Sequence, residues 1–215
     1  MPFDRFRRRK ETPEAGAATG AAGARPGRGV RFDGLTEEWR IVGQMHIPGR
    51  LSDALNKREA VPISDVRWAP ADGSEPLTEA PGLKTVDPYD LIMVMAGEES
   101  LPPLSDTERT AHKVHKIAYD VALEVPPFRA LGTVYLYPGS EPDRLLDRAT
   151  EMFVPIVDAT AYLGDLSLGE SMDAILVNRF YLRGVEQIDR RTGERHQRLP
   201  GAPLGGVSYS DRGSR

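Results

Sequence analysis

Two stretches of the chain carry the same residue pattern in the same order. The first is Val42-Gly43-Gln44-Met45-His46-Ile47-Pro48-Gly49-Arg50-Leu51-Ser52-Asp53, followed by Val61-Pro62-Ile63-Ser64-Asp65. The second is Leu131-Gly132-Thr133-Val134-Tyr135-Leu136-Tyr137-Pro138-Gly139, then Arg144-Leu145-Leu146-Asp147, then Val154-Pro155-Ile156-Val157-Asp158. We interpret the chain as an internal duplication, so that each copy should fold into the same small unit.

Composition restricts the class of protein. The chain has 215 residues and no Cys, which excludes disulfides, thiolate metal ligands and a cysteine nucleophile. No segment approaches the roughly 20 apolar residues of a membrane span. The arginines near the N-terminus are not followed by the apolar stretch of a signal peptide. The sequence therefore predicts a soluble, cytoplasmic protein.

Charge is distributed unevenly along the chain. Residues 1–30 hold seven basic and three acidic side chains, and residues 189–215 hold six and three. The residues between them carry a net charge near −11. Because an acidic body repels phosphates, binding of nucleic acid is expected only through the basic tails. Both tails are poor in bulky apolar residues, and we expect them to be disordered.

The first copy should contain strands and one short helix. Ordered structure is expected to begin between Phe32 and Trp39. Period-two alternation after Arg40 predicts a strand, and Leu51 and Leu55 predict a helix ending near Lys57, with Ser52 or Asp53 as its cap. A strand at residues 61–68 and a loop at 70–88 should follow. The apolar run from Asp90 to Met95 predicts a central strand that is covered on both faces.

The second copy should repeat this course. Alternation from His115 predicts one more strand, and Pro126-Pro127 is interpreted as the joint between the copies. Strands are expected at residues 130–137, 153–162, 173–178 and 180–188, with a helix at 142–150 and a loop at 163–171. Residues 173–178 are taken to correspond to 90–95.

These patterns predict an α+β, β-rich fold of two tandem strand–short helix–strand–strand–strand modules, packed with pseudo-two-fold symmetry. Either two packed sheets or one composite barrel would satisfy them. The expected divisions are a basic disordered tail (1–30), module 1 (31–125), module 2 (126–189) and a flexible C-terminal tail (190–215).

The first copy resembles a family of small uncharacterised bacterial modules, a domain of unknown function. The resemblance rests on the Pro48-Gly49 turn, on Arg50-Leu51-Ser52-Asp53-Ala54-Leu55-Asn56, and on Val61-Pro62-Ile63 with Asp65. It covers about 60 residues, is weaker in the second copy, and implies no activity. A looser likeness, of residues 175–185 to the strand–turn–strand of Sm-like RNA-binding folds, conflicts with the acidic body.

Arg50 with Asp53, and Arg144 with Asp147, recur at the start of the two expected helices. Each pair has two interpretations. The arginines could grip a carboxylate or phosphate beside a helix N-terminus, or each aspartate could cap the helix or pair with its arginine. The sequence-based candidates for ligand binding are therefore Arg50 and Arg144. Asp65 and Asp158 also correspond, and a role in a turn or a cross-strand contact is expected.

Patterns of catalysis are absent from the sequence. There is no nucleophile elbow, phosphate loop or dinucleotide glycine pattern. His112 and His115 are a poor metal pair, because residues three apart on a strand point to opposite faces and no third ligand is evident. The sequence thus predicts no catalytic residues, no metal and no cofactor.

The leading hypothesis is a non-enzymatic protein-binding or scaffold protein whose partner is another protein. One alternative is a small-ligand sensor with a site between the copies, lined by Arg50 and Arg144. Another is weak nucleic-acid binding through the tails. Exposed sheet edges would also allow homodimerisation by strand addition.

Overall fold

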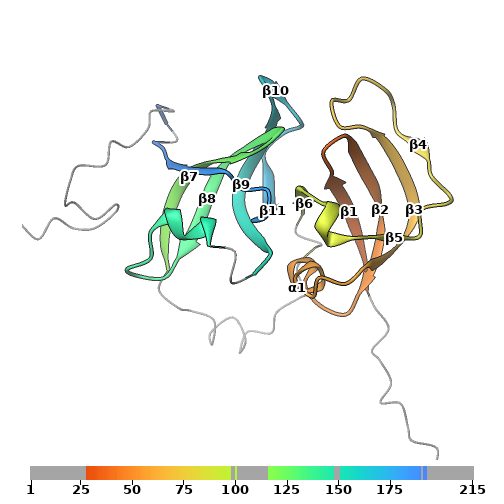
Figure 1. Ribbon diagram of the computed structural model, residues 1–215, viewed down its shortest axis with the longest axis horizontal. Helices are drawn as coiled ribbons and strands as arrows, with labels where there is room; N and C mark the ends of the chain where they lie inside the picture. The colour runs from red at the N-terminus through yellow and green to blue at the C-terminus, as the bar shows by residue number, and fades with distance from the viewer. Residues whose placement is uncertain (1–27, 98–99, 101–115, 148–150, 190, 193–215) are drawn as a thin grey trace, which may run out of the picture.

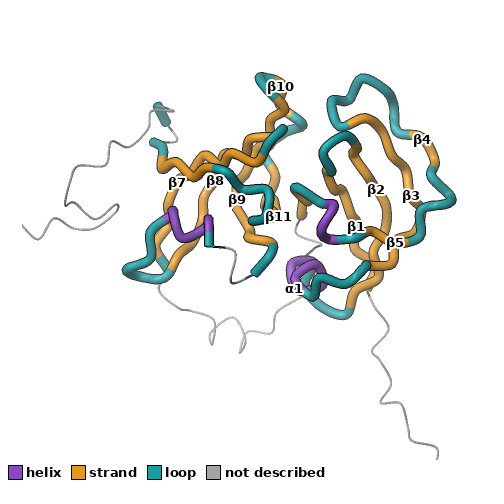
Figure 2. The backbone as a smooth tube through the Cα atoms, viewed as in Figure 1, coloured by secondary structure: helices purple, strands orange, loops and turns teal. Residues whose placement is uncertain are grey.

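The computed structural model describes residues 28–97, 100, 116–147, 151–189 and 191–192. We call residues 28–97 the first half and residues 116–189 the second half. Both halves are built almost entirely of antiparallel strands, with very little helix (Figure 2). None of the helices in these described ranges has the length and apolar character needed to cross a membrane.

The elements of the first half are β1 (Arg28–Leu35), β2 (Trp39–Ile47), α1 (Leu51–Asn56), β3 (Val61–Pro70), β4 (Thr78–Glu79), β5 (Thr85–Val86), the 3-10 helix η1 (Pro88–Asp90) and β6 (Met93–Ala96). Those of the second half are β7 (Ile117–Val125), β8 (Phe128–Leu136), the 3-10 helix η3 (Pro142–Leu146), β9 (Phe153–Leu163), β10 (Leu166–Ser167), β11 (Met172–Asn178) and β12 (Gly184–Gln187).

The twelve strands of the described ranges belong to one open antiparallel sheet in the order β12-β7-β8-β9-β11-β6-β1-β2-β3-β4, with β10 beside β9 and β5 beside β3. The halves meet where β6 pairs with β11, in the middle of the molecule (Figure 1). The strands are therefore neither a composite barrel nor two separate sheets.

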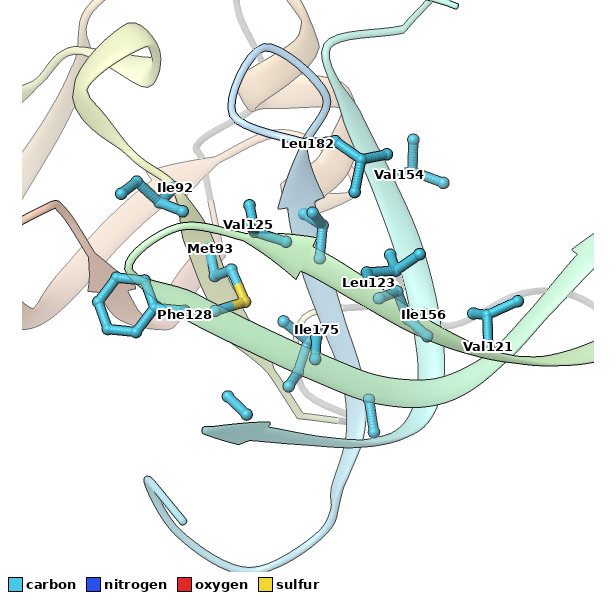
Figure 3. Packing of buried hydrophobic residues seen from close by; sticks show 14 of the residues in the cluster. Ile92, Met93, Val121, Leu123, Val125, Phe128, Val154, Ile156, Ile175 and Leu182 are labelled. Atoms are coloured by element: carbon cyan, nitrogen blue, oxygen red, sulfur yellow. The ribbon is translucent and has the colours of Figure 1, made fainter. Parts of the chain in front are cut away.

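Two apolar cores lie on opposite faces of this central pair of strands. On β6, Met93 and Met95 pack into the core of the second half, whereas Val94 and Ala96 pack into that of the first half. Figure 3 shows Met93 beside Phe128 and Ile175 in the second-half core. Because successive strand residues point to opposite faces, a central strand with a core on each side must be apolar throughout. The prediction of a covered central strand from the run Asp90 to Met95 is confirmed.

Two asparagine side chains, one buried and one half-buried, join the halves. The amide of Asn178 has no exposed surface, and it donates to the carbonyls of Leu91 (2.7 Å) and Pro88 (3.3 Å). Its oxygen accepts from the N–H of Phe180 at 3.0 Å. In α1, Asn56 bonds both backbone groups of Phe153, accepting at 2.7 Å and donating at 3.3 Å. Both asparagines thus add side-chain hydrogen bonds between the halves.

The predicted strands of the two halves largely match β2, β3, β7, β8, β9 and β11. The strand β1 was missed as a whole, because the sequence pattern predicts a first strand only after Arg40. The expected loops contain the short strands β4, β5 and β10. The predicted strand from Phe180 begins only at Gly184, after a turn. Pro126-Pro127, interpreted from the sequence as the joint between the copies, forms the turn of the β7–β8 hairpin, and β7 packs in the second-half core.

The two helices also differ in detail from the expectation. The first is present as α1, but Arg50 stands at its N-cap and no side chain caps it. The second is a 3-10 turn of five residues with Pro142 at its start. Of the tails predicted at 1–30 and 190–215, residues 28–30 instead belong to β1, and residues 191–192 form a turn. Residues 1–27, 190 and 193–215 lie outside the described residues.

We predict that Asn178→Ala lowers the free energy of unfolding by about 3 kcal/mol, because each buried polar group left without a partner costs about 1–3 kcal/mol. Urea denaturation would measure it, with a single transition for both halves. Asn56→Ala, whose hydrogen bonds are only part-buried, should cost about 1 kcal/mol. An Asn178→Ala protein as stable as wild type would contradict the role assigned to the buried amide.

Candidate functional site

Each half contains a bulge at a glycine in its second strand. The register of β2 with β3 shifts between Val42 and Gln44, around Gly43, and that of β8 with β9 shifts between Leu131 and Thr133, around Gly132. A Cβ on Gly43 would lie 2.8 Å from the Ser64 carbonyl oxygen, and one on Gly132 would lie 2.8 Å from the Ile156 side chain. The neighbouring strand approaches too closely at both positions for any side chain.

An aspartate in left-handed backbone conformation faces each bulge. Asp65 has φ of 52° and Asp158 has φ of 47°. Asp and Asn tolerate this region better than other non-glycine residues. The two aspartates were expected at corresponding positions, and the structure shows a backbone conformation that the sequence pattern did not reveal.

The third strands of the two halves have different neighbours. β9 pairs with β11 from Phe153 to Ala159. In β3, only Val61 and Pro62 pair with β5, and only Arg67 and Trp68 pair with β4. Between these points the chain is held by two bonds, from the N–H of Ala80 to the Val66 carbonyl (2.8 Å) and from the N–H of Ile63 to the Lys84 carbonyl (2.9 Å). The edge of β3 is therefore left open beside the first bulge.

A cleft of about 920 Å³ lies at this opening, and we call it the bulge cleft. Its volume is within the usual range of small-ligand sites. It is lined by Arg31, Val42, Gly43, Gln44, Ile63, Ser64, Asp65, Val66, Arg67, Glu79, Ala80, Pro81, Leu83 and Lys84.

An ion pair between a buried carboxylate and a half-buried guanidinium lies next to the bulge cleft. Asp33 is 3% exposed and receives two hydrogen bonds from the Arg40 guanidinium, at 2.9 and 2.7 Å. These contacts raise the pKa of Arg40. Arg31, in the cleft lining, lies 3.8 Å from the same carboxylate and has a 62% exposed side chain. Asp33 is thus neutralised mainly by Arg40, and Arg31 keeps most of its surface in solvent.

A second candidate surface lies at the end of the same sheet. The chain has two tryptophans, and both are exposed: Trp39 (39%) and Trp68 (41%) stack with ring centroids 5.0 Å apart. The N–H of Ala71 bonds to the Glu38 carbonyl at 2.8 Å, which brings the turn of Asp72 beside the turn of Glu38. We call the two rings with Glu38, Asp72 and Glu75 the tryptophan surface.

The carboxylates of the tryptophan surface are solvent-exposed. The hydrogen bonds from Ser74 lower the pKa of Asp72, so this group stays ionised at neutral pH. Residues 32–39 and 68–83 contain no Lys or Arg. The rings are therefore flanked by acidic side chains along these segments.

The two arginines singled out by the sequence lie elsewhere. Arg50 is half-buried ahead of α1, and Arg144 is exposed in η3. Neither lines the bulge cleft, and neither forms an ion pair with Asp53 or Asp147 among the described residues. The expected local pairing is therefore not found.

Sequence reasoning singled out Gly43 and Asp65, which line the bulge cleft, but it missed the basic residues of the cleft and the tryptophan surface. Arg31, Arg67 and Lys84 come from three separate segments, and only the strand register brings them together. The tryptophans carried a weaker signal: Trp39 immediately precedes one predicted strand and Trp68 ends another. His112 and His115 lie outside the described residues, within which no group of three His, Cys, Asp or Glu could hold a metal.

No family model, no curated protein and no solved structure matches this chain. The resemblance to a bacterial module family therefore stays a prediction, and the functional argument rests on the geometry of the two surfaces.

We predict that Gly43→Ala and Gly132→Ala each lower the free energy of unfolding by about 1–3 kcal/mol, because a Cβ forces the paired strands apart. Gly49→Ala is the control, since nothing lies within 4 Å of its added Cβ. It should change stability by less than about 0.5 kcal/mol. Thermal and urea unfolding would measure all three, and equal effects would contradict the close approach at the bulges.

We also predict that Arg40→Ala lowers the free energy of unfolding by about 3 kcal/mol, because the buried carboxylate of Asp33 would lose the guanidinium that neutralises it. The double variant Asp33→Leu with Arg40→Met should recover most of this loss, since it removes both charges. Urea denaturation at pH 7 compares the three proteins. A double variant as unstable as Arg40→Ala would show that the charge is not the cause.

Proposed function

We propose that the protein is a non-enzymatic binding protein of the bacterial cytoplasm, and that it holds a partner protein through the tryptophan surface. One observation carries the proposal: the only two tryptophans of the chain are stacked on each other in solvent. Tryptophan is strongly enriched among the residues that dominate binding energy at protein interfaces. A cross-strand aromatic pair also stabilises its sheet by about 0.5–1.5 kcal/mol, but this role does not require exposed rings.

The partner segment that this surface fits is rich in arginine. A guanidinium stacks on the face of a tryptophan ring and is attracted to its π electrons. The same group forms paired hydrogen bonds with carboxylates such as those of Glu38, Asp72 and Glu75. Because no cation lies in the two segments that form the surface, an incoming arginine meets no like charge along them.

We further infer that the halves are tandem copies related by pseudo-two-fold symmetry. Two equivalent turns support this. Asp87 accepts a hydrogen bond from the N–H of Tyr89 (2.9 Å), and Asn178 accepts one from the N–H of Phe180 (3.0 Å). The rings of Tyr89 and Phe180 stack on each other, with centroids 5.9 Å apart. On this scheme β12, which pairs with β7 as β6 pairs with β1, is the counterpart of β6. This replaces the correspondence of residues 173–178 with 90–95 that the sequence predicts.

The experiment uses a peptide with the sequence of residues 1–12, which contains four arginines, and the same peptide with glutamine at those arginines. The host is the full chain with Arg5, Arg7, Arg8 and Arg9 replaced by Gln, so that its own basic segment does not compete. Since both tryptophans lie in the surface, their fluorescence reports binding directly. We predict a saturable change with the arginine peptide and none with the glutamine peptide.

Calorimetry on variants then locates the site. Trp68→Ala should weaken peptide binding by about 2 kcal/mol, roughly 30-fold in Kd. Tyr135→Ala is the matched control, because it removes a 50% exposed aromatic ring from the second half. Equal loss in both variants, or equal binding of both peptides, would reject the tryptophan surface as the site.

A further inference from the structure

We infer that the bulge cleft is a binding site for a small molecule with one oxyanion group, a carboxylate or a phosphate, held by Arg31, Arg67 and Lys84. This inference is independent of the tryptophan surface and its partner. It begins with the distribution of charge. Residues 28–97 contain eight Lys or Arg and eleven Asp or Glu. Three of the eight basic residues line this one cleft, in a half that is acidic as a whole.

The second bulge shows that the fold does not need these cations. Arg31 faces Gln44 in the strand register, whereas the residues facing each other at the second bulge are Asp120 and Thr133. Thr133 donates to Asp120 at 2.6 Å. The second bulge thus also has a glycine and a left-handed aspartate. Where the first bulge has Arg31 facing Gln44, however, the second has Asp120 facing Thr133. The cations of the first bulge therefore call for another explanation, and an anionic ligand supplies one.

The three cations are available to a ligand. Neither Arg67 nor Lys84 forms an ion pair within 4.0 Å among the described residues, although Glu79 stands opposite Arg67 in the register of β3 with β4. Arg31 reaches only Asp33, which Arg40 already binds through both carboxylate oxygens. A guanidinium without a paired carboxylate can form two parallel hydrogen bonds to an oxyanion.

The rest of the lining limits what the ligand can be. Ile63, Val66 and Leu83 offer an apolar wall, while Ser64 and Gln44 offer hydrogen-bonding groups. Asp65 and Glu79 would repel a second anionic group. The ligand class is therefore a small molecule with a single oxyanion group and an uncharged or basic remainder that includes some apolar surface.

The test uses the full chain and three probes of similar size: phenyl phosphate, phenylacetate and the uncharged 2-phenylethanol, at constant ionic strength. Calorimetry should show saturable binding of at least one anion and none of the alcohol. The stronger of the two anions identifies whether phosphate or carboxylate is preferred. No saturable binding of either anion up to millimolar concentration would overturn the inference.

Variants locate the site. Arg67→Ala combined with Lys84→Ala should lower the affinity for the bound anion at least tenfold. Both positions are exposed, so the unliganded variant should unfold at the wild-type temperature. Arg50→Ala and Arg144→Ala are matched controls that remove arginines outside the cleft and should bind as wild type does. If these controls lose binding while the cleft variant retains it, the oxyanion site lies at the helix starts and the inference is wrong.

Discussion

The pairing of β6 with β11 is the interaction on which the rest of the structure depends. Within the part of the chain that the structure describes, these strands are the only pair in the sheet that links the halves, and each sends alternate side chains into different cores. Val94 and Leu176 complete the first-half core, while Met93 and Ile175 complete that of the second half. If the halves separated, each would lose apolar side chains from its core and expose one face of a central strand. At about 25 cal/mol per Å² of apolar surface, that loss is large relative to the net stability of a domain, so the described halves should fold together.

The two bulges have the same local geometry, but the third strand has different neighbours in the two halves. Gly43 and Gly132 allow the same close approach of strands, and Asp65 and Asp158 adopt the same left-handed conformation. In the second half, β11 then covers the edge of the third strand. In the first half only short strands do so, and a cleft remains. The position of the candidate site therefore follows from the neighbour of the third strand, and the bulge itself is common to both halves.

Local patterns predicted the elements of the fold well and their arrangement poorly. Period-two alternation predicted most long strands, and the apolar run from Asp90 to Met95 predicted the central one. Both signals arise because the pattern of apolar residues in a strand reflects whether one or both of its faces are buried. The strand β1 was missed because Gly29 and Gly34 weaken its alternation. Which strands pair across the chain depends on contacts between distant segments, so the single open sheet could not be derived. Arg50 and Arg144 drew attention through short-range spacing, whereas the residues of the bulge cleft meet only through strand register.

The bulge cleft and the tryptophan surface meet at the β3–β4 hairpin. Arg67 lines the cleft and Trp68, the next residue, belongs to the tryptophan surface. Successive residues of a strand point to opposite faces, so a ligand and a partner protein would approach the sheet from opposite sides without competing for space. Both would nevertheless contact residues paired with β4, where Glu79 faces Arg67 and Thr78 faces Trp68. A two-residue strand is a weak element, since it contributes few hydrogen bonds and little buried surface. If a ligand or a partner protein orders this hairpin when it binds to one face, binding to the other face costs less conformational entropy. The two surfaces would then bind with positive cooperativity.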